Sequence, residues 1–447
     1  MATWFEDAVF YHIYPLGLCG APERNDFVSP PEPRLRRVFT WLDHARQLGA
    51  NALILGPVFE STGHGYDTAD YFKVDRRLGD DALLADLVRH AHGLGLRVLL
   101  DAVFGHTGRD FWAFRDLQRN GTTSAYKDWY RGVDFGRRSP RGDAFSYEFW
   151  QGAQELPRLR QDYPEVRRHL LDSVSHWVQC FDIDGLRLDT ADCLDLEFLT
   201  VLRRHTDSLK ADFRLLGEAI RGDYNLFANP NRLHSVTNYE TYKGLWSSHY
   251  DHNFFEIAYA LNRQFGTTGL YRGIPLYNFA DNHDVDRVAS KLQDRAHLFS
   301  LYCLLFTMPG VPSVYCGSEW GLEASRTPTD DRMLRPALDL EALRRCQSQD
   351  LVDTISRLAL LRHRAPALRR GNYHQLAVGA EHLAFERAIS GERVVVVVNA
   401  GPTPLPLKEL IPQQAIQDWM DLLNGDEHLR TEHTQVPPRW ARVLRQI

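Results

Sequence analysis

The sequence contains few cysteines and no long apolar run. Its six cysteines, scattered over 447 residues without CxxC spacing, indicate neither a disulfide framework nor a cysteine metal site, and we expect them to be small buried side chains. No stretch of 18 apolar residues exists, and the N-terminal MATWFEDAVFYHIYPL lacks a charged segment followed by an apolar one. We therefore expect a cytoplasmic protein with no membrane-spanning helix and no signal peptide.

The sequence also lacks runs of like charge. The formal net charge is −6, and no five consecutive residues carry the same sign, so neither nucleic acid nor an anionic membrane is expected as a partner. The hydrophobic fraction of 44% and charged fraction of 25% are ordinary for a globular protein. A chain of this length and composition buries a large core without covalent or metal support.

Short apolar runs alternate with helical patterns along most of the chain. The clearest helix is predicted over residues 164–181, where apolar side chains recur at three- and four-residue spacing behind Pro164. The expected buried strands lie at residues 9–16, 52–59, 97–106, 185–190, 214–219, 235–240, 275–283 and 313–319. Eight such strands separated by helices predict an α/β fold, a parallel (β/α)8 barrel.

Two stretches interrupt this alternation. Residues 107–162 are rich in aromatics, arginine and glycine, and we expect a short irregular subdomain inserted after the third strand. From about residue 369 the pattern changes to short β runs such as RVVVVVN at 393–399. The expected organisation is a catalytic barrel at 1–106 and 163–368, the inserted subdomain at 107–162, and a small all-β domain at 369–447.

Polar residues gather at the predicted carboxyl ends of five strands. In chain order they are Tyr66, Asp67, Asp101, His106, Arg187, Asp189, Glu218, His283 and Asp284. In a parallel barrel these ends meet at one rim, where catalytic residues are found. Burying so many charges for stability alone is costly, so their convergence indicates an active site.

Two of these carboxylates fit glycosyl transfer. Retaining glycosidases hold two carboxyls about 5–5.5 Å apart, and adjacent strands lie about 4.7–4.9 Å apart, so Asp189 and Glu218 on neighbouring strands match that spacing. Arg187 lies two residues before Asp189, on the same face of the strand. We expect Arg187 to lower the pKa of Asp189, and an apolar setting to raise the pKa of Glu218.

These motifs resemble the α-amylase family, glycoside hydrolase family 13, over about residues 5–365. The matching segments are DAVFGH at 101–106, GLRLDT at 185–190, GEA at 217–219, FADNHD at 279–284, GPVFE at 56–60, HGYD at 64–67 and GVPSVY at 310–315. Their order and spacing are those of the family. The C-terminal β region resembles the family loosely.

The resemblance implies a role for each site residue. Asp189 would be the nucleophile, Glu218 the acid/base and Asp284 the transition-state stabiliser, with retention of the α configuration. Asp101 would be structural at the site, and Tyr66 would stack on the reacting sugar. The remaining substrate-binding residues implied are Asp67, His106, Arg187 and His283.

The sequence departs from the family pattern at a calcium site. The family usually has an asparagine at the position of Gly105, and classical amylases have Lys-His at the position of Ala191-Asp192. Glycine offers no side-chain oxygen to a hard cation. We therefore predict no structural calcium there and no other metal or cofactor.

The segment LPRLR at 156–160 resembles a motif of the cyclomaltodextrinase, neopullulanase and maltogenic amylase group. This implies a maltooligosaccharide, cyclodextrin or related α-glucan as substrate. Those enzymes dimerise through an N-terminal β domain that precedes the barrel, whereas this sequence begins at the barrel, so the oligomeric state stays open. Substrate length and α-1,4 against α-1,6 preference also stay open.

Two alternatives remain. A transglycosidase would need acceptor-stacking aromatics, for which the candidates are Phe111, Trp112, Trp150 and Trp246. A non-catalytic barrel scaffold is the other alternative, although such proteins usually lose a catalytic carboxyl and all three are present here.

Overall fold

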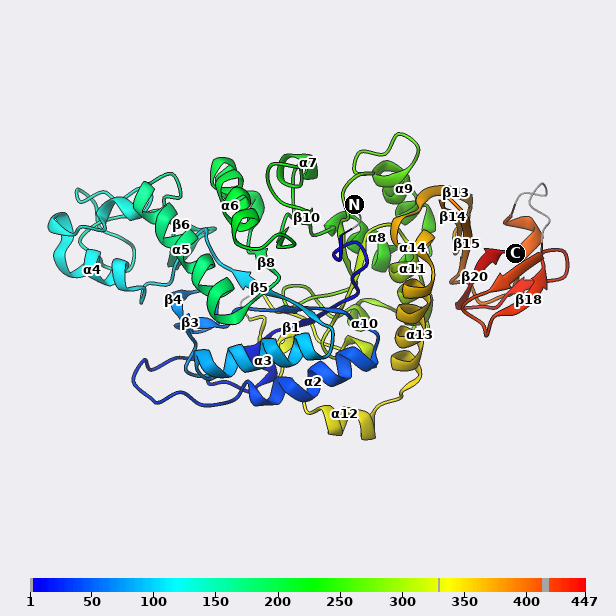
Figure 1. Cartoon of the computed structure of the whole chain (residues 1–447), viewed down its shortest axis with the longest axis horizontal. Coiled ribbons are helices and arrows are strands. Elements are labelled where there is room, and N and C mark those ends of the chain that lie inside the picture. The colour runs from blue at the N-terminus through cyan, green and yellow to red at the C-terminus, as the bar shows by residue number, and fades with distance from the viewer. Residues whose placement is uncertain (1–2, 329, 412–417) are drawn as a thin grey trace.

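The computed structural model describes residues 3–328, 330–411 and 418–447 and shows a parallel barrel with a β sheet beside it (Figure 1). Eight parallel strands pair in the order β10-β9-β8-β5-β2-β1-β12-β11. A parallel bridge between Thr237 and Tyr277 joins the two outer strands and closes the ring. The barrel strands are β1 (Phe10–Ile13), β2 (Ala52–Leu55), β5 (Arg97–Ala102), β8 (Gly185–Leu188), β9 (Arg214–Gly217), β10 (Ser235–Val236), β11 (Tyr277–Phe279) and β12 (Val311–Tyr315).

Most helices connect successive barrel strands. The helices are α1 (Pro15–Leu18), α2 (Arg36–Gln47), α3 (Asp81–Gly93), α4 (Trp112–Asn120), α5 (Pro164–Phe181), α6 (Leu196–Leu209), α7 (Tyr224–Phe227), α8 (Tyr239–Tyr250), α9 (Phe254–Phe265), α10 (Val288–Lys291), α11 (His297–Thr307), α12 (Leu340–Cys346), α13 (Asp350–Arg364) and α14 (Pro366–Arg370). Of these, α4 belongs to the segment at 107–162, and α12 to α14 follow the last barrel strand. The predicted helix at 164–181 is confirmed as α5, which buries Val166, Leu170, Val174 and Trp177.

Alternation of side chains along the strands divides the core in two. Phe10, Ile54 and Leu99 belong to one buried cluster, whereas their strand neighbours Tyr11 and Leu53 belong to the larger cluster that includes the helices. Because successive side chains of a strand point to opposite faces, the smaller cluster fills the barrel and the larger one lies between barrel and helices.

The segment at 107–162 and the C-terminal sheet lie at opposite ends of the molecule (Figure 1). The former contains α4 and the hairpin of β6 (Phe149–Trp150) and β7 (Ala153–Pro157). The latter is a six-stranded antiparallel sheet in the order β13-β14-β15-β20-β17-β18. Its strands are β13 (Asn372–Val378), β14 (His382–Ile389), β15 (Glu392–Asn399), β17 (Asp418–Asp421), β18 (Glu427–Arg430) and β20 (Trp440–Gln446), and the smaller pairs are β3 (Phe59–Ser61) with β4 (Thr68–Val74) and β16 (Leu405–Pro406) with β19 (Gln435–Val436).

The predicted barrel and its eight strands are confirmed, but two details of the sequence prediction are wrong. The strand expected at 235–240 covers only Ser235–Val236, because the Asn238 side chain caps α8 and Tyr239 begins that helix. Of the cysteines expected to be buried, Cys180 and Cys193 are exposed, while Cys19, Cys303 and Cys316 are buried; the Cys346 side chain lies outside the described residues. No helix among the described residues is long and apolar enough to cross a membrane.

Candidate active site

Arg187 is the centre of the polar cluster at the carboxyl ends of the barrel strands. Its Nη1 lies 2.9 Å from Asp101 Oδ1 and 3.1 Å from Asp189 Oδ1, and its Nη2 lies 2.8 Å from Glu218 Oε2. The side chains of all four residues are less than a tenth exposed. A planar guanidinium with several fixed donors can hold three carboxylates in one arrangement, so Asp189 and Glu218 face each other across a shared cation.

Strand register places these side chains at one level. Asp101 pairs with Arg187, and Leu188 with Gly217, so Asp189 and Glu218 follow paired residues on neighbouring strands. Two glycines permit this close packing: a Cβ on Gly185 would lie 2.3 Å from the Arg214 carbonyl oxygen, and one on Gly217 would lie 2.3 Å from a Leu233 methyl.

Tyr66, His283 and Asp284 form a second group beside Arg187. The Tyr66 hydroxyl donates to Asp101 Oδ2 at 2.9 Å and also contacts His283 Nε2. The Tyr66 and His283 rings are nearly parallel, with centroids 5.5 Å apart, and His283 Nε2 lies 2.9 Å from Asp284 Oδ2. The Asp284 side chain is 33% exposed, against 9% for Asp189, so Asp284 is the more open to solvent.

Asp67 and His106 make contacts mainly with the backbone around Tyr66. Asp67 Oδ1 accepts from the Gly65 amide at 3.2 Å, and His106 Nε2 lies 3.0 Å from the Tyr66 carbonyl oxygen. The ring of Trp150 stacks over His106 with centroids 5.8 Å apart. The structure thus brings all nine predicted site residues together, with Asp67 and His106 at the edge of the cluster.

Arg187 acts to lower the pKa of Asp189, as expected, but the net shift of that pKa is upward. Burial raises the pKa of Asp189 above its usual range, Arg187 opposes this rise, and the negative charges of Glu218 and Asp101 add to it. Sequence reasoning counted the neighbouring cation but not the loss of water around the carboxyl. At Asp284 the neighbouring charges outweigh burial. Burial acts to raise the pKa of Asp284, but the charge of His283, followed by that of Arg335, lowers it.

Three residues of the cluster were missed by sequence reasoning. Arg335 Nη2 lies 2.8 Å from Asp284 Oδ1, the Tyr14 ring stacks on His283 with centroids 5.7 Å apart, and the Tyr239 hydroxyl donates to Glu218 Oε1 at 3.1 Å. Tyr14 follows β1 directly, so its position at a strand end was a usable signal. Arg335 lies between β12 and α12 in a segment without periodicity, and no sequence pattern marks it.

Of the proposed acceptor-stacking aromatics, only Trp150 lies beside the site. Phe111 is fully buried, and Trp112 packs against Tyr126 and Trp129 at centroid distances of 4.9 and 5.3 Å. Trp246 is covered by the Lys291 ammonium, 4.6 Å from its centroid. Phe111 and Trp246 are therefore packing residues, and Trp112, although 38% exposed, packs against two neighbouring rings.

The positions where the family holds calcium are used differently here. A Cβ on Gly105 would lie 3.5 Å from a Leu194 methyl, and Asp192 Oδ2 accepts from the Ile220 and Arg221 amides at 3.1 and 3.3 Å. Within residues 3–328, 330–411 and 418–447, no three His, Cys, Asp or Glu side chains are grouped so that they could hold a metal ion. The absence of calcium stays a prediction.

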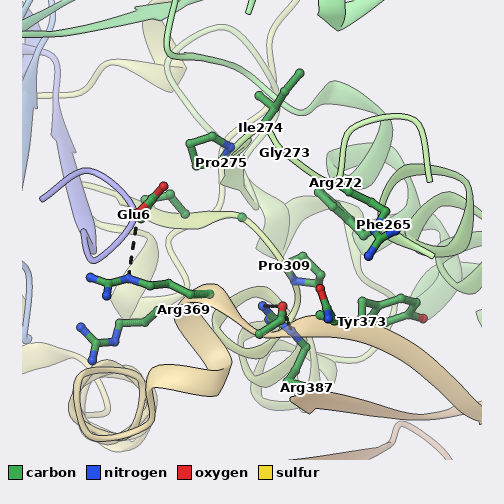
Figure 2. Close-up of a pocket in the computed structure, with 15 residues that line it drawn as sticks. Glu6, Phe265, Arg272, Gly273, Ile274, Pro275, Pro309, Arg369, Tyr373 and Arg387 are labelled. Atoms are coloured by element: carbon green, nitrogen blue, oxygen red, sulfur yellow. Dashed lines mark hydrogen bonds and ion pairs between the residues drawn. The ribbon is translucent and has the colours of Figure 1, made fainter. Parts of the chain in front are cut away.

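A separate pocket of about 330 Å³ is lined by none of these residues (Figure 2). It opens where residues 272–275 and 309–311 lead into β11 and β12, against Tyr373 and Arg387 of the C-terminal sheet. Its arginines are already engaged, because Arg387 donates to the Thr307 and Gly371 carbonyls and Arg369 pairs with Asp7. The pocket is therefore a junction between barrel and sheet.

An acidic pair on a shared arginine at the carboxyl rim of a (β/α)8 barrel defines the class as a barrel enzyme acting on glycosidic bonds. The sequence profile of the alpha-amylase catalytic domain matches residues 34–357. The chain is therefore a member of the α-amylase family of glycoside hydrolases, the family that its motifs predicted.

Relatives and solved structures agree with this membership. A cyclomaltodextrinase from Geobacillus thermopakistaniensis is 30% identical over 97% of this chain and 76% of the relative. Neopullulanase 2 of Thermoactinomyces vulgaris is 31% identical over 95% of this chain and 74% of the relative. The structure of a cyclic alpha-maltosyl-(1→6)-maltose hydrolase from Arthrobacter globiformis superposes with a TM-score of 0.84 and 28% identity, covering 100% of both chains.

Proposed function

We propose that this enzyme hydrolyses α-glucosidic bonds in maltooligosaccharides, cyclodextrins or related short α-glucans with retention of configuration. The observation that carries the proposal is the shared cation: Asp189 and Glu218 bind different nitrogens of the Arg187 guanidinium, at 3.1 and 2.8 Å. This shared contact supports the short separation of the two carboxyls that double displacement requires. The names of the relatives support short or cyclic α-glucans as substrates.

In the proposed mechanism, Asp189 attacks the anomeric carbon and Glu218 donates a proton to the leaving oxygen. A covalent glycosyl-enzyme forms, and Glu218 then takes a proton from the attacking water. The site holds four carboxylates, Asp101, Asp189, Glu218 and Asp284, against the two guanidinium groups of Arg187 and Arg335. The mechanism requires Glu218 to carry a proton and Asp189 to be ionised when substrate binds.

The other site residues would hold the reacting sugar. Tyr66 offers a ring face, and His283 and Asp284 offer hydrogen-bonding groups to hydroxyls on the same side of the site. Asp284, the most exposed of the carboxylates and the one with a lowered pKa, would remain ionised and stabilise the positive charge that develops on the sugar.

A transglycosidase is the second candidate, and a groove beside Glu218 favours it. The groove is lined by Tyr239, whose hydroxyl binds Glu218, and by Ile220 and Tyr259. Ile220 is 51% exposed and Tyr259 is 70% exposed, which gives an apolar surface on which an acceptor sugar could stack. Trp150 adds a further aromatic near His106.

A time course of products decides between these functions. Purified enzyme is incubated with maltotriose, longer maltodextrins, a cyclodextrin and pullulan. Hydrolysis gives only shorter products, whereas transfer gives transient products longer than the substrate. Products of the β configuration at first release would contradict retention.

The catalytic role is tested by Glu218→Gln, which should lower hydrolysis by several orders of magnitude and leave the melting temperature close to that of the wild type. The matched control is Glu386→Gln, since Glu386 is a half-buried carboxylate on strand β14 of the C-terminal sheet that pairs with Arg393. Full activity in Glu218→Gln would reject the assignment. Activity lost equally in both variants would point to a general structural effect.

A further inference from the structure

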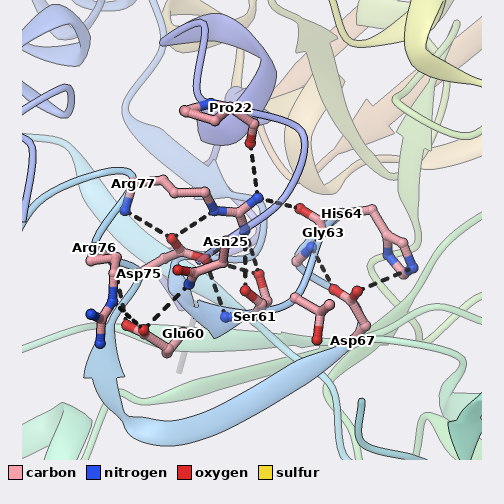
Figure 3. A network of polar contacts seen from close by, with 12 residues as sticks. Pro22, Asn25, Glu60, Ser61, Gly63, His64, Asp67, Asp75, Arg76 and Arg77 are labelled. Atoms are coloured by element: carbon pink, nitrogen blue, oxygen red, sulfur yellow. Dashed lines mark hydrogen bonds and ion pairs between the residues drawn. The ribbon is translucent and has the colours of Figure 1, made fainter. Parts of the chain in front are cut away.

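A buried arginine outside the catalytic cluster supports the loop that carries Tyr66 (Figure 3). We propose that Arg77 is a positioning residue for catalysis: its guanidinium fixes the loop at residues 63–67 and thereby holds the Tyr66 ring against the reacting sugar. The proposal rests on the proposed function, in which Tyr66 contacts that sugar. Arg77 itself touches none of the catalytic carboxylates among its recorded contacts.

Every nitrogen of the Arg77 guanidinium donates a hydrogen bond. Nε and Nη2 bind the two oxygens of Asp75 at 2.9 and 2.7 Å, and Nη2 also donates to Ser61 Oγ at 2.8 Å. Nη1 donates to the carbonyl oxygens of Gly63 at 2.7 Å, Pro22 at 3.0 Å and Glu23 at 3.3 Å. The Arg77 side chain is 5% exposed and that of Asp75 is fully buried, so the charge is compensated by a forked ion pair.

The Gly63 carbonyl that Arg77 binds lies three residues before Tyr66 in the same loop. After Gly63, the His64 carbonyl accepts from the Tyr14 hydroxyl at 2.6 Å. Gly65 then takes a positive φ of 86°, and a Cβ there would lie 2.6 Å from Pro57 Cβ. The loop is therefore fixed at three consecutive residues immediately before Tyr66, and Arg77 holds the first of them.

The same guanidinium joins a second segment to this loop. Pro22 and Glu23 belong to the segment between α1 and α2, and the Glu23 carboxylate pairs with Arg332. Arg335, three residues further along, binds Asp284. Arg77 thus joins two segments of backbone, and we expect its loss to displace Tyr66 without removing a group that contacts substrate.

Arg362 provides a matched control. It is also fully buried and also donates to three carbonyl oxygens, those of Phe306, Leu368 and Gly310, at 3.1, 3.1 and 2.5 Å. None of its partners lies in the catalytic cluster. A purely structural role predicts the same behaviour for Arg77 and Arg362, whereas a positioning role separates them.

The test uses Arg77→Lys, because lysine keeps the charge but cannot bind Asp75 and reach the Gly63 and Pro22 carbonyls together. We expect kcat/KM on maltotriose to fall at least about tenfold, mainly through kcat, since small displacements of aligned groups cost up to about 100-fold. Arg362→Lys should lower the melting temperature comparably and leave kcat/KM within twofold at temperatures well below unfolding. An equal loss of kcat/KM in both variants would overturn the proposal.

A double-mutant cycle with Tyr66→Ala tests the route of the effect. If Arg77 acts through Tyr66, Arg77→Lys should change kcat/KM by less than twofold in the Tyr66→Ala background. Losses that multiply in the double variant would overturn the proposal. Should Arg77→Lys fail to fold, Ser61→Ala removes one Arg77 contact and allows the same cycle at smaller amplitude.

A crystal structure of Arg77→Lys gives a readout independent of turnover. The expected result is a shifted loop at 63–67 and a broken hydrogen bond from Tyr66 to Asp101. An unmoved Tyr66 would overturn the positioning role even if activity fell. A wild-type enzyme without activity on any α-glucan would instead overturn the proposed function, and a shifted Tyr66 would still be seen.

Discussion

Arg335 binds Asp284 in a geometry that fixes the carboxylate at the mouth of the site. Its Nη2 lies 2.8 Å from Asp284 Oδ1, and its Nε donates to the carbonyl of the preceding residue, His283, at 3.0 Å. The guanidinium also lies over the Tyr14 ring, 4.9 Å from the centroid. One arginine therefore orients both the side chain and the backbone of the segment that is proposed to hold the sugar hydroxyls.

This arrangement predicts a pH-dependent defect in Arg335→Met. The charges of His283 and then Arg335 lower the pKa of Asp284 against the effect of burial, so removing the arginine should raise that pKa. We expect kcat/KM to fall by up to about 100-fold, because a displaced Asp284 aligns poorly with the substrate, and its acid limb to move to higher pH. Arg344→Met, which removes an arginine on α12 paired with Glu341, should change neither. An unchanged acid limb in Arg335→Met would contradict the account.

The pKa shifts at the site predict opposite stability effects for two substitutions. The pKa of an aspartate in the unfolded chain is about 3.9. When the pKa in the folded protein is higher, the carboxyl loses its contribution to stability as the pH rises from the unfolded-state pKa through the folded-state pKa. Since burial raises the pKa of Asp189, Asp189→Asn should melt at a higher temperature than the wild type at pH 7, and the gain should shrink toward pH 4.

Asp284→Asn should behave in the opposite way. The pKa of Asp284 is lowered in the folded protein. The ionised carboxylate therefore stabilises the protein at pH values above the unfolded-state pKa, and this contribution is lost as the pH falls through the folded-state pKa. The variant should therefore melt below the wild type at pH 7, with a gap that narrows below about pH 4. Scanning calorimetry from about pH 3 to pH 8 measures both variants, and shifts of the same sign at pH 7 would contradict the charge balance described here.

Calcium independence is a further prediction. Gly105 has no side-chain oxygen and faces a Leu194 methyl, and one carboxylate oxygen of Asp192 is engaged by the amides of Ile220 and Arg221, so the two family ligand positions do not form a cation site. Chelator treatment followed by gel filtration should leave the melting temperature and activity unchanged. A fall of many degrees, restored by added calcium, would show that a site exists elsewhere.

Periodic segments of the fold could be predicted from the sequence alone. Helix α5 begins and ends at the predicted residues because Pro164 starts it and its apolar face is regular. The predicted strands were too long at their carboxyl ends, because rim residues such as Tyr239 continue an apolar pattern although they belong to loops and helices. The two-residue strand β10 is defined by pairing with β9, which no local pattern contains.

Site residues could likewise be predicted where local motifs mark them, and could not be predicted where they depend on contacts between distant parts of the sequence. Asp189, Glu218 and Asp284 could be predicted because each lies in a motif at a strand end. Arg335 could not be predicted, because its place in the site depends on a contact with Asp284, which lies 51 positions away in the sequence. The net rise in the pKa of Asp189 could not be predicted, because burial is a property of the folded site. The opposing effect of Arg187 could be predicted, because Arg187 is a neighbour in the sequence.

Direct trapping of the glycosyl-enzyme is the most decisive measurement. An α-maltosyl fluoride needs no protonated leaving group, so Glu218→Gln should accept it at Asp189 and accumulate the intermediate, because deglycosylation lacks its base. Mass spectrometry of the digested protein should then find a maltosyl adduct on the peptide containing Asp189, and none in Glu218→Gln/Asp189→Asn. An adduct on another residue, or no adduct together with release of a β product, would contradict the assignment of Asp189 as nucleophile.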